Sequence, residues 1–162
     1  MIKVGDRLPE GRLRIKNDDG TASDRATGDL FGGKTVVLVG VPGAFTSTCH
    51  NAHIPQFIAN AEAFRDKGVD QVVVMAVNDH HVMKAWDEVL GGAGKVAFVA
   101  DGNGDYSRAL GLEVDLSAGG LGRRCKRFSA LIRDGVVATL NFEPDGSRSI
   151  DATGAATMLA QV

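Results

Sequence analysis

Three short segments made almost wholly of apolar, often β-branched residues limit the folds open to this chain. They are Thr35–Val41, Val72–Val77 and Val96–Ala100. A continuous apolar run of this length is typical of a strand that is covered on both faces, as in a parallel sheet. Segments with helical spacing of apolar residues separate the three runs. This alternation predicts parallel strands joined by right-handed helical crossovers.

The predicted helices have recognisable ends. The first begins at a cap provided by Ser47 or Thr48 and runs to Lys67, where Gly68 is typical of a C-terminal stop. We expect a kink at Pro55, because proline removes a backbone hydrogen bond inside a helix. Two further helices are expected, one capped by Asn78-Asp79 and reaching Leu90, and one over Tyr106–Leu110.

The pattern changes near the C-terminus. Two apolar runs, Arg127–Arg133 and Val136–Phe142, are joined at Asp134-Gly135, which is a strong hairpin signal. A last helix is expected over Ala152–Gln161. This order of elements favours an α/β, thioredoxin-like fold, with a mixed central sheet and helices on both faces. The length of 162 residues suits a single domain over positions 1–162.

Charge and composition narrow the choice of partners. The net charge is −2, and Lys and Arg form no basic run, so no nucleic-acid partner is expected. No stretch approaches the roughly 18 apolar residues of a membrane span, so no membrane partner is expected either. The start of the chain lacks the apolar core of a signal peptide, and a cytoplasmic location follows as the expectation. Two cysteines, Cys49 and Cys125, are expected to be free thiols there.

Cys49 occupies a position that favours chemistry. It lies in the run from Pro42 to His50, between a predicted strand and the helix that follows it. A thiol in the first helical turn faces free backbone N–H groups and the positive end of the helix dipole. Both favour the thiolate, which is the nucleophilic form of cysteine. The sequence therefore predicts a cysteine nucleophile on a strand-to-helix turn.

The dipole alone is too weak to hold a thiolate, so a cation or further donor must come from elsewhere in the fold. Thr46 can turn its hydroxyl toward the sulfur, and Pro42 can shape and shield the loop. His50 and His53 are near in sequence but titrate close to neutrality. The candidate cations in one short segment are Arg123, Arg124, Lys126 and Arg127.

The pattern Pro42-x-x-x-Thr46-x-x-Cys49 resembles the active-site motif of the peroxiredoxins. The longer string PGAFTSTC, followed by His53 and Pro55, resembles the type-five (redoxin) subfamily. The resemblance covers nearly the whole chain. Further blocks that match in order are Val77-Asn78-Asp79, Val82–Trp86, Ala100–Gly104, Ala109–Leu112 and Asp134–Val137.

This resemblance implies a thiol-dependent peroxidase that reduces hydrogen peroxide and organic hydroperoxides without a metal or an organic cofactor. By position, Cys49 is the peroxidatic nucleophile, Thr46 holds the peroxide and Pro42 closes the pocket. Arg127 matches the arginine that supports the thiolate and polarises the peroxide. The resemblance also implies a homodimer and an external thiol reductant, either glutaredoxin or glutathione or thioredoxin.

The chain departs from the family pattern in three places. Ser47 replaces a proline, His50 replaces a smaller residue, and the tail carries no resolving cysteine. Cys125 is the other thiol, and in a strand its side chain would share a face with Arg127. That geometry leaves a resolving role as the alternative, but an incidental thiol and a one-cysteine enzyme are the favoured interpretation.

Two other functions compete with the peroxidase as interpretations of these residues. A peroxide-sensing or redox-relay module would use the same thiol with little turnover. A zinc site would need ligands from the set Cys49, His50, His53, Asp79, His80 and His81, whose adjacent members do not point together on a helix. The glycine clusters near 102–104 and 119–122 are interpreted as turns. The stretch Leu112–Leu121 is placed at the pocket mouth, where its apolar residues would receive an alkyl hydroperoxide or a second subunit.

Overall fold

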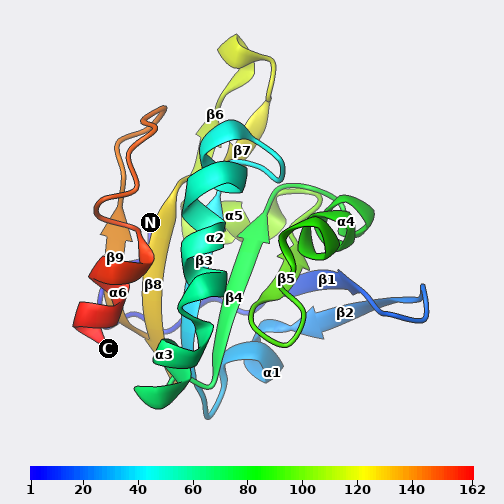
Figure 1. Cartoon of the computed structure of the whole chain (residues 1–162). Coiled ribbons are helices and arrows are strands. Elements are labelled where there is room, and N and C mark those ends of the chain that lie inside the picture. Colours follow the sequence, from blue (N-terminus) through cyan, green and yellow to red (C-terminus); the bar gives the residue numbers. More distant parts are fainter.

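The computed structural model describes residues 1–162 and is built around a sheet of seven strands in the order β2-β1-β5-β4-β3-β8-β9 (Figure 1). Its strands are β1 (Arg12–Lys16), β2 (Ala22–Ala26), β3 (Thr35–Val41), β4 (Gln71–Ala76), β5 (Ala97–Ala100), β8 (Phe128–Arg133) and β9 (Val136–Phe142). A separate two-stranded arm is formed by β6 (Glu113–Asp115) and β7 (Arg123–Cys125). The helices are α1 (Thr27–Phe31), η1 (Cys49–His53), α2 (Ile54–Ala59), α3 (Ala61–Asp66), α4 (His80–Leu90), α5 (Asp105–Leu110), η2 (Ser117–Gly119) and α6 (Ala155–Gln161).

The predicted mixed sheet is confirmed. Strands β3, β4 and β5 are parallel neighbours, whereas β8 runs antiparallel to β3 and β9 antiparallel to β8. Asp134 and Gly135 turn the β8–β9 hairpin with φ values of 48° and 73°, the left-handed pair that a two-residue turn needs. The β1–β2 hairpin was not predicted, because β2 is the edge strand, β1 lies next to it, and both carry few apolar residues.

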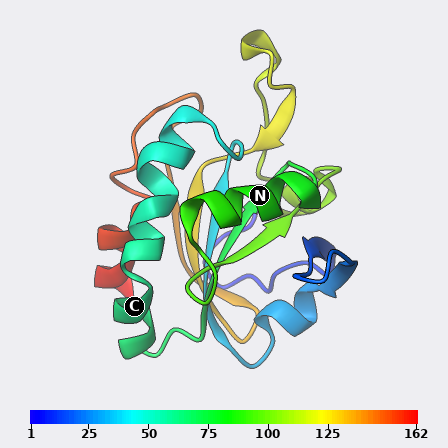
Figure 2. The same ribbon diagram turned by 45° about the vertical axis from the view of Figure 1, so that its right-hand side comes forward.

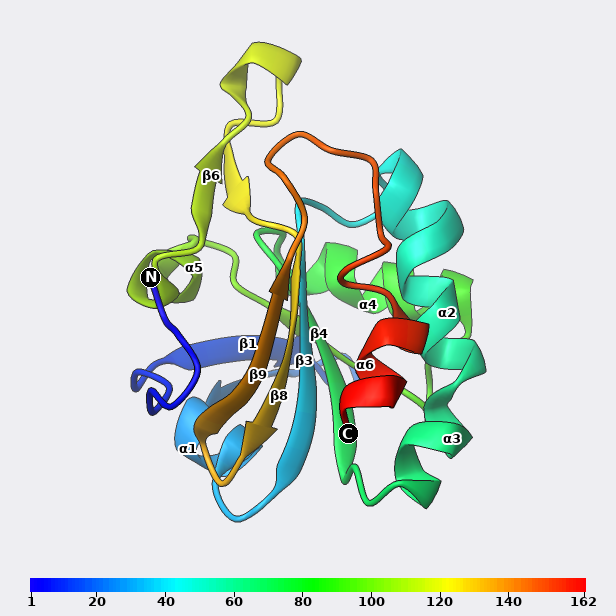
Figure 3. The same cartoon turned by 90° about the vertical axis from the view of Figure 1, so that its left-hand side faces the viewer.

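Helices cover both faces of the sheet. Figure 3 shows α2, α3, α4 and α6 on one side of the sheet, and α1 and α5 on the other. The first side buries a cluster that includes Val39, Phe57 and Trp86, and the second buries one that includes Leu38 and Phe128. Alternate residues of β3 therefore enter opposite cores, as expected of a strand covered on both faces. No helix has the combination of length and hydrophobicity needed to cross a bilayer.

The long helix expected after β3 is divided. Its first turns, from Cys49 to His53, are a π-helix in which the N–H of Ile54 donates to the carbonyl of Cys49. Pro55 lies in the first turn of α2, and the wider turn before it relieves the clash of a proline ring with the preceding turn. A second break falls at Asn60, between α2 and α3. Neither Ser47 nor Thr48 caps the helix with its side chain, so that expectation was wrong.

The other predicted helices agree closely with the structure. Asp79 caps α4 by accepting the N–H of Val82 at 2.9 Å, and Gly91 ends the helix in the left-handed conformation at φ 70°. The last helix begins at Ala155 rather than Ala152. Figure 2 shows the β6–β7 arm projecting from one end of the sheet, where the connection between β9 and α6 also lies.

Strand pairing brings distant segments to that same end of the sheet. In the antiparallel β3–β8 pair, Gly40 lies opposite Phe128, so the loop after β3 meets Arg127. Phe128 also pairs with Phe142, which places Glu143 beside Arg127. The absence of a side chain at Gly40 leaves room for the ring of Phe128, since a Cβ there would lie 2.0 Å from that ring. Gly40 therefore permits the close packing that positions Arg127.

We predict that Gly40→Ala lowers the free energy of unfolding by about 1–3 kcal/mol, because the ring of Phe128 must move. Gly28→Ala is the matched control, since a Cβ at this helical glycine meets nothing within 4 Å. It should leave stability unchanged or raise it by up to about 1 kcal/mol. Urea unfolding curves of both variants and the wild type measure this. Equal midpoints for the two variants would contradict the account.

Candidate active site

Cys49 lies in the first turns of the helical segment that follows β3, and it is buried, with 1% of its surface exposed. The first helical hydrogen bond here runs from the N–H of His50 to the carbonyl of Thr46, at 2.8 Å. The backbone N–H groups just before it therefore have no helical acceptor. The thiol stands at the positive end of a helix, as predicted, and this environment favours an anion.

Arg127 is the cation that reaches this sulfur. Its Nη1 donates to the Sγ of Cys49 at 3.4 Å, across 78 positions of sequence. The guanidinium is buried, with 8% of the residue exposed. A charged donor in a buried setting is a stronger partner than one at the surface. The structure thus brings together two of the four predicted site residues in direct contact.

The same nitrogen of Arg127 also contacts His53, at 3.1 Å from Nδ1. Because an arginine only donates, Nδ1 must accept and carries no proton. The other ring nitrogen, Nε2, lies 3.1 Å from the carbonyl oxygen of Thr153, so Nε2 carries the proton and donates. His53 is therefore a neutral imidazole that bonds the arginine, not a cation beside the sulfur.

Burial explains why His53 is neutral. Desolvation lowers its pKa from 6.5 to about 4, and the positive charge of Arg127 acts in the same direction. The carbonyl of Thr153 and the charge of Glu143 oppose the shift without cancelling it. His53 therefore stays neutral through the physiological range and keeps Nδ1 free to accept from Arg127.

His50, the other nearby histidine, is held away from the sulfur. Its Nδ1 accepts the indole N–H of Trp86 at 3.0 Å, and its ring stacks on Phe45 with centroids 5.5 Å apart. Phe45 has a φ of 60°, a left-handed conformation uncommon for a bulky residue, and its ring is partly exposed. Strain of this kind is typical of loops that position functional groups.

The loop before Cys49 is tied down from two directions. The hydroxyl of Thr46 donates to the carbonyl of Gly43 at 2.7 Å, so its proton is not directed at the sulfur as we had expected. Arg124 lies across the loop, with Nη1 at 3.4 Å from the carbonyl of Pro42 and at the same distance from that of Val77. Arg124 was one of four candidate cations, and its hydrogen bonds go to backbone carbonyls around the loop rather than to the thiol.

A cavity of about 480 Å³ opens beside these groups. Thr46, Ser47 and Thr48, which directly precede Cys49, line it together with Arg127. Its other walls come from the β6–β7 arm and from the connection after β9. Apolar side chains of the arm, Val114, Leu116 and Leu121, face this space, which agrees with the predicted place of the Leu112–Leu121 stretch.

Cys125 is not where the strand argument placed it. It ends β7, fully buried in the core cluster that holds Phe128, whereas Cys49 belongs to the cluster on the other face. Lys126 and Arg127 lie between β7 and β8 and belong to neither strand, so the alternation does not carry through to Arg127. Burial raises the pKa of the Cys125 thiol to about 12. This thiol is therefore protonated, and it is not among the residues that line the cavity.

The histidines considered as metal ligands have separate partners and do not converge on one point. His53 bonds Arg127 and His50 bonds Trp86, while the rings of His80 and His81 on α4 lie tilted against each other with centroids 4.1 Å apart. The structure gathers no group of three His, Cys, Asp or Glu side chains suited to a metal ion.

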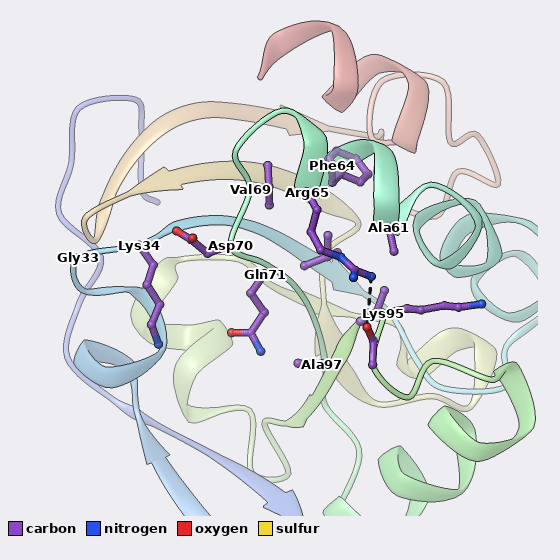
Figure 4. Close-up of a pocket in the computed structure, with 13 residues that line it drawn as sticks. Gly33, Lys34, Ala61, Phe64, Arg65, Val69, Asp70, Gln71, Lys95 and Ala97 are labelled. Atoms are coloured by element: carbon purple, nitrogen blue, oxygen red, sulfur yellow. Dashed lines mark hydrogen bonds between the residues drawn. The ribbon is translucent and has the colours of Figure 1, made fainter.

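A second cavity, of about 580 Å³, lies at the opposite end of the parallel strands (Figure 4). Lys34, Arg65 and Lys95 surround it, and Arg65 donates to the carbonyl of Gly94 at 3.3 Å. It holds no thiol or imidazole. The cavity beside Cys49 is therefore the candidate active site.

The buried imidazole predicts a stability that depends on pH. Since the folded-state pKa of His53 lies below 6.5, the unfolded chain takes up the proton first as the pH falls. The contribution of His53 is complete above pH ~6.5 and is lost progressively toward pH ~4, by about 3 kcal/mol at most. Urea unfolding of the wild type and of His53→Gln between pH 7 and pH 4 measures this effect. The free energy of unfolding should fall more steeply with decreasing pH in the wild type than in the variant. Parallel declines would contradict it.

Comparisons with known proteins agree with this site. The family model described as Redoxin matches residues 3–159. Peroxiredoxin-2C of Oryza sativa subsp. japonica is 46% identical over 149 residues, which cover 92% of each chain. Chloroplastic and mitochondrial peroxiredoxins of Arabidopsis thaliana also match, at 41% and 38% identity.

Solved structures agree as well. Reduced Prx3 from Vibrio vulnificus, crystallised in complex with hydrogen peroxide, is 42% identical with a TM-score of 0.91, and the match covers 99% of this chain and 98% of that one. Peroxiredoxin 5 from Alvinella pompejana is 31% identical with a TM-score of 0.85, covering 99% and 97%. The chain therefore belongs to the redoxin family, among the type-five peroxiredoxins, and is a thiol-dependent peroxidase with a thioredoxin-like fold.

Proposed function

We propose that Cys49 is the peroxidatic nucleophile and that Arg127, Thr46 and Pro42 build its pocket. The observation that carries this assignment is the contact of 3.4 Å between Arg127 Nη1 and Cys49 Sγ, beside an open cavity. A buried cation on the sulfur favours the thiolate. A relative that is 42% identical was crystallised in its reduced form with hydrogen peroxide, which supports peroxide as the substrate.

The reaction then follows from the arrangement. The thiolate sulfur attacks one peroxide oxygen, the O–O bond breaks, and its electron pair goes to the departing oxygen. That oxygen takes up a proton and leaves as water, or as an alcohol when the substrate is an organic hydroperoxide. Cys49 becomes a sulfenic acid, the first step of cysteine oxidation.

The pocket residues lower the barrier by meeting the charge that develops on the departing oxygen. The guanidinium of Arg127 and the free N–H groups at the helix start are donors already in place for it. The hydroxyl of Thr46 donates its hydrogen bond to the carbonyl of Gly43, so its oxygen can accept a hydrogen bond from the peroxide and orient the substrate. Pro42 walls the cavity and has no N–H to compete for the substrate.

Regeneration of the thiol requires an external reductant. Two external thiols supply two electrons, form a disulfide with each other and release the sulfenic oxygen as water, through a mixed disulfide on Cys49. We propose that Cys125 takes no part, because it is protonated and buried in the opposite core. Glutathione, glutaredoxin and thioredoxin are the proposed donors, since each presents a reactive thiol.

The setting of the enzyme is part of the same proposal. We propose one domain over residues 1–162, because the central sheet takes strands from both ends of the sequence. Both cysteines are free thiols, which fits the reducing cytoplasm. A homodimer is proposed from the exposed apolar residues beside the site, among them Phe45 and Leu121.

The assignment predicts the effect of three substitutions. Cys49→Ser should abolish peroxide consumption, and Arg127→Ala and Thr46→Val should each lower kcat/KM by about 10²-fold or more, because a donor or an orienting oxygen is lost. Thr46→Ser keeps the hydroxyl, and Arg65→Ala removes an arginine at the opposite end of the sheet, so both serve as controls near wild-type activity. Peroxide consumption with a small dithiol as donor measures all five.

Sustained turnover in that assay also distinguishes an enzyme from a sensor, because a sensor would be oxidised once and stop. Full activity in Cys49→Ser would overturn the assignment of the nucleophile. Equal activities in Thr46→Val and Thr46→Ser would overturn the role of the hydroxyl.

The one-cysteine mechanism makes a separate prediction. Cys125→Ser should keep turnover with a small dithiol within about twofold of wild type, because Cys125 lies in the opposite core. Urea unfolding of the variant and of the wild type identifies any folding defect. A collapse of turnover in a folded Cys125→Ser variant would make Cys125 the resolving thiol.

A further inference from the structure

Glu143 is a buried carboxylate that the proposed reaction does not use. It directly follows β9, and 7% of its surface is exposed. Its Oε1 accepts the N–H groups of Ala152 and Thr153 at 2.8 and 2.9 Å, and the hydroxyl of Thr153 at 3.2 Å. A buried carboxylate requires such donors, because desolvation without them is costly. The carboxylate thereby anchors the segment just before α6.

That anchored segment faces His53. The carbonyl oxygen of Thr153 lies 3.1 Å from His53 Nε2, and the Thr153 hydroxyl oxygen lies 3.2 Å from it. Because the hydroxyl gives its proton to Glu143, its oxygen offers only lone pairs to the imidazole. Both oxygens therefore accept, and both require the proton of His53 to be on Nε2.

The proton on Nε2 determines the role of the other ring nitrogen, Nδ1. Nδ1 is left as an acceptor and takes an N–H of Arg127, whose Nη1 also donates to Cys49. We propose that Glu143 is a positioning residue for peroxide reduction: through Thr153 it fixes the tautomer and orientation of His53, which hold Arg127 on the sulfur of Cys49. This inference rests on the proposed roles of Arg127 and Cys49.

Two charged groups act on His53, and they come from different elements. Arg127, just before β8, disfavours the imidazolium, and Glu143, just after β9, favours it, while burial decides the balance for the neutral ring. In the segment from Cys49 to Phe57, the proposed thiolate of Cys49 is the one further charge, and it shares Arg127 Nη1 with the ring; Phe57 contacts the ring edge-on. The role of Glu143 is therefore to hold the acceptors in place rather than to ionise the imidazole.

The test is the second-order rate at which hydrogen peroxide oxidises the reduced protein in a single turnover, without reductant. Glu143→Leu removes the acceptor and should lower this rate about tenfold or more, because Arg127 is no longer held in place. Glu143→Gln keeps an acceptor oxygen and should remain within about threefold of wild type. Asp151→Asn removes an exposed carboxylate from the same connection and is the matched control, with a wild-type rate expected.

A double-variant cycle with His53→Gln separates positioning from general damage. If Glu143 acts through His53, Glu143→Leu should add little to the loss already caused by His53→Gln. Fully additive losses, or a wild-type rate in a folded Glu143→Leu variant, would overturn the inference. Nitrogen NMR of the labelled imidazole gives a readout besides activity: a dominant Nε2–H tautomer in the wild type, weakened in Glu143→Leu.

A second pair of variants covers a failure of Glu143→Leu to fold. Thr153→Val removes only the hydroxyl and should lower the rate severalfold, whereas Thr153→Ser keeps it and should not. Equal rates for this pair would overturn the inference. An unchanged rate in Arg127→Ala would instead refute the proposed function, so the two failures are distinguishable.

Discussion

The contact between the guanidinium of Arg127 and the sulfur of Cys49, at 3.4 Å, is the interaction on which the chemistry of this fold depends. Each residue needs the other. The helix dipole alone is too weak to stabilise a thiolate at Cys49, and a buried guanidinium at Arg127 is costly without acceptors. Strand pairing brings the two residues to the same end of the sheet. The antiparallel β3–β8 pair places the end of β3 beside the start of β8, and Gly40 leaves space for the Phe128 ring next to Arg127.

The arginine in turn needs a second acceptor, and His53 provides it as a neutral ring. Its neutrality follows from burial, which lowers the pKa to about 4, and its orientation follows from the acceptors on Thr153. The π-helical turn from Cys49 to His53 is part of this arrangement. It lies directly before Pro55 and sets the angle about the helix axis between the thiol and the imidazole. The site is thus a chain of hydrogen bonds across the core, with the sulfur at its open end.

Local patterns predicted the parts of the fold that depend on local physics. The apolar run Thr35–Val41, the Asp79 cap and the Asp134-Gly135 turn were all confirmed. The β1–β2 hairpin was missed because its polar strands depend on pairing with the rest of the sheet, which β1 joins beside β5. Cys49 was identifiable from its place at a strand-to-helix turn, but Arg127 could be chosen over Arg124 only through the family resemblance. The bond between His53 and Thr153 spans 100 positions, and no spacing rule connects residues so far apart. The face of Cys125 was predicted wrongly because strand alternation fails where the chain leaves β7 at Lys126.

The most direct test of the account is the mass of the reduced protein after one equivalent of hydrogen peroxide, measured without reductant and followed by peptide mapping. The account predicts the gain of one oxygen, located on Cys49, because Cys125, the other thiol, is buried in the core on the opposite face of the sheet. Loss of two hydrogens, which signals a disulfide between Cys49 and Cys125, would contradict the one-cysteine mechanism. Oxygen located on Cys125 with Cys49 untouched would contradict the central claim that Arg127 makes Cys49 the reactive thiol.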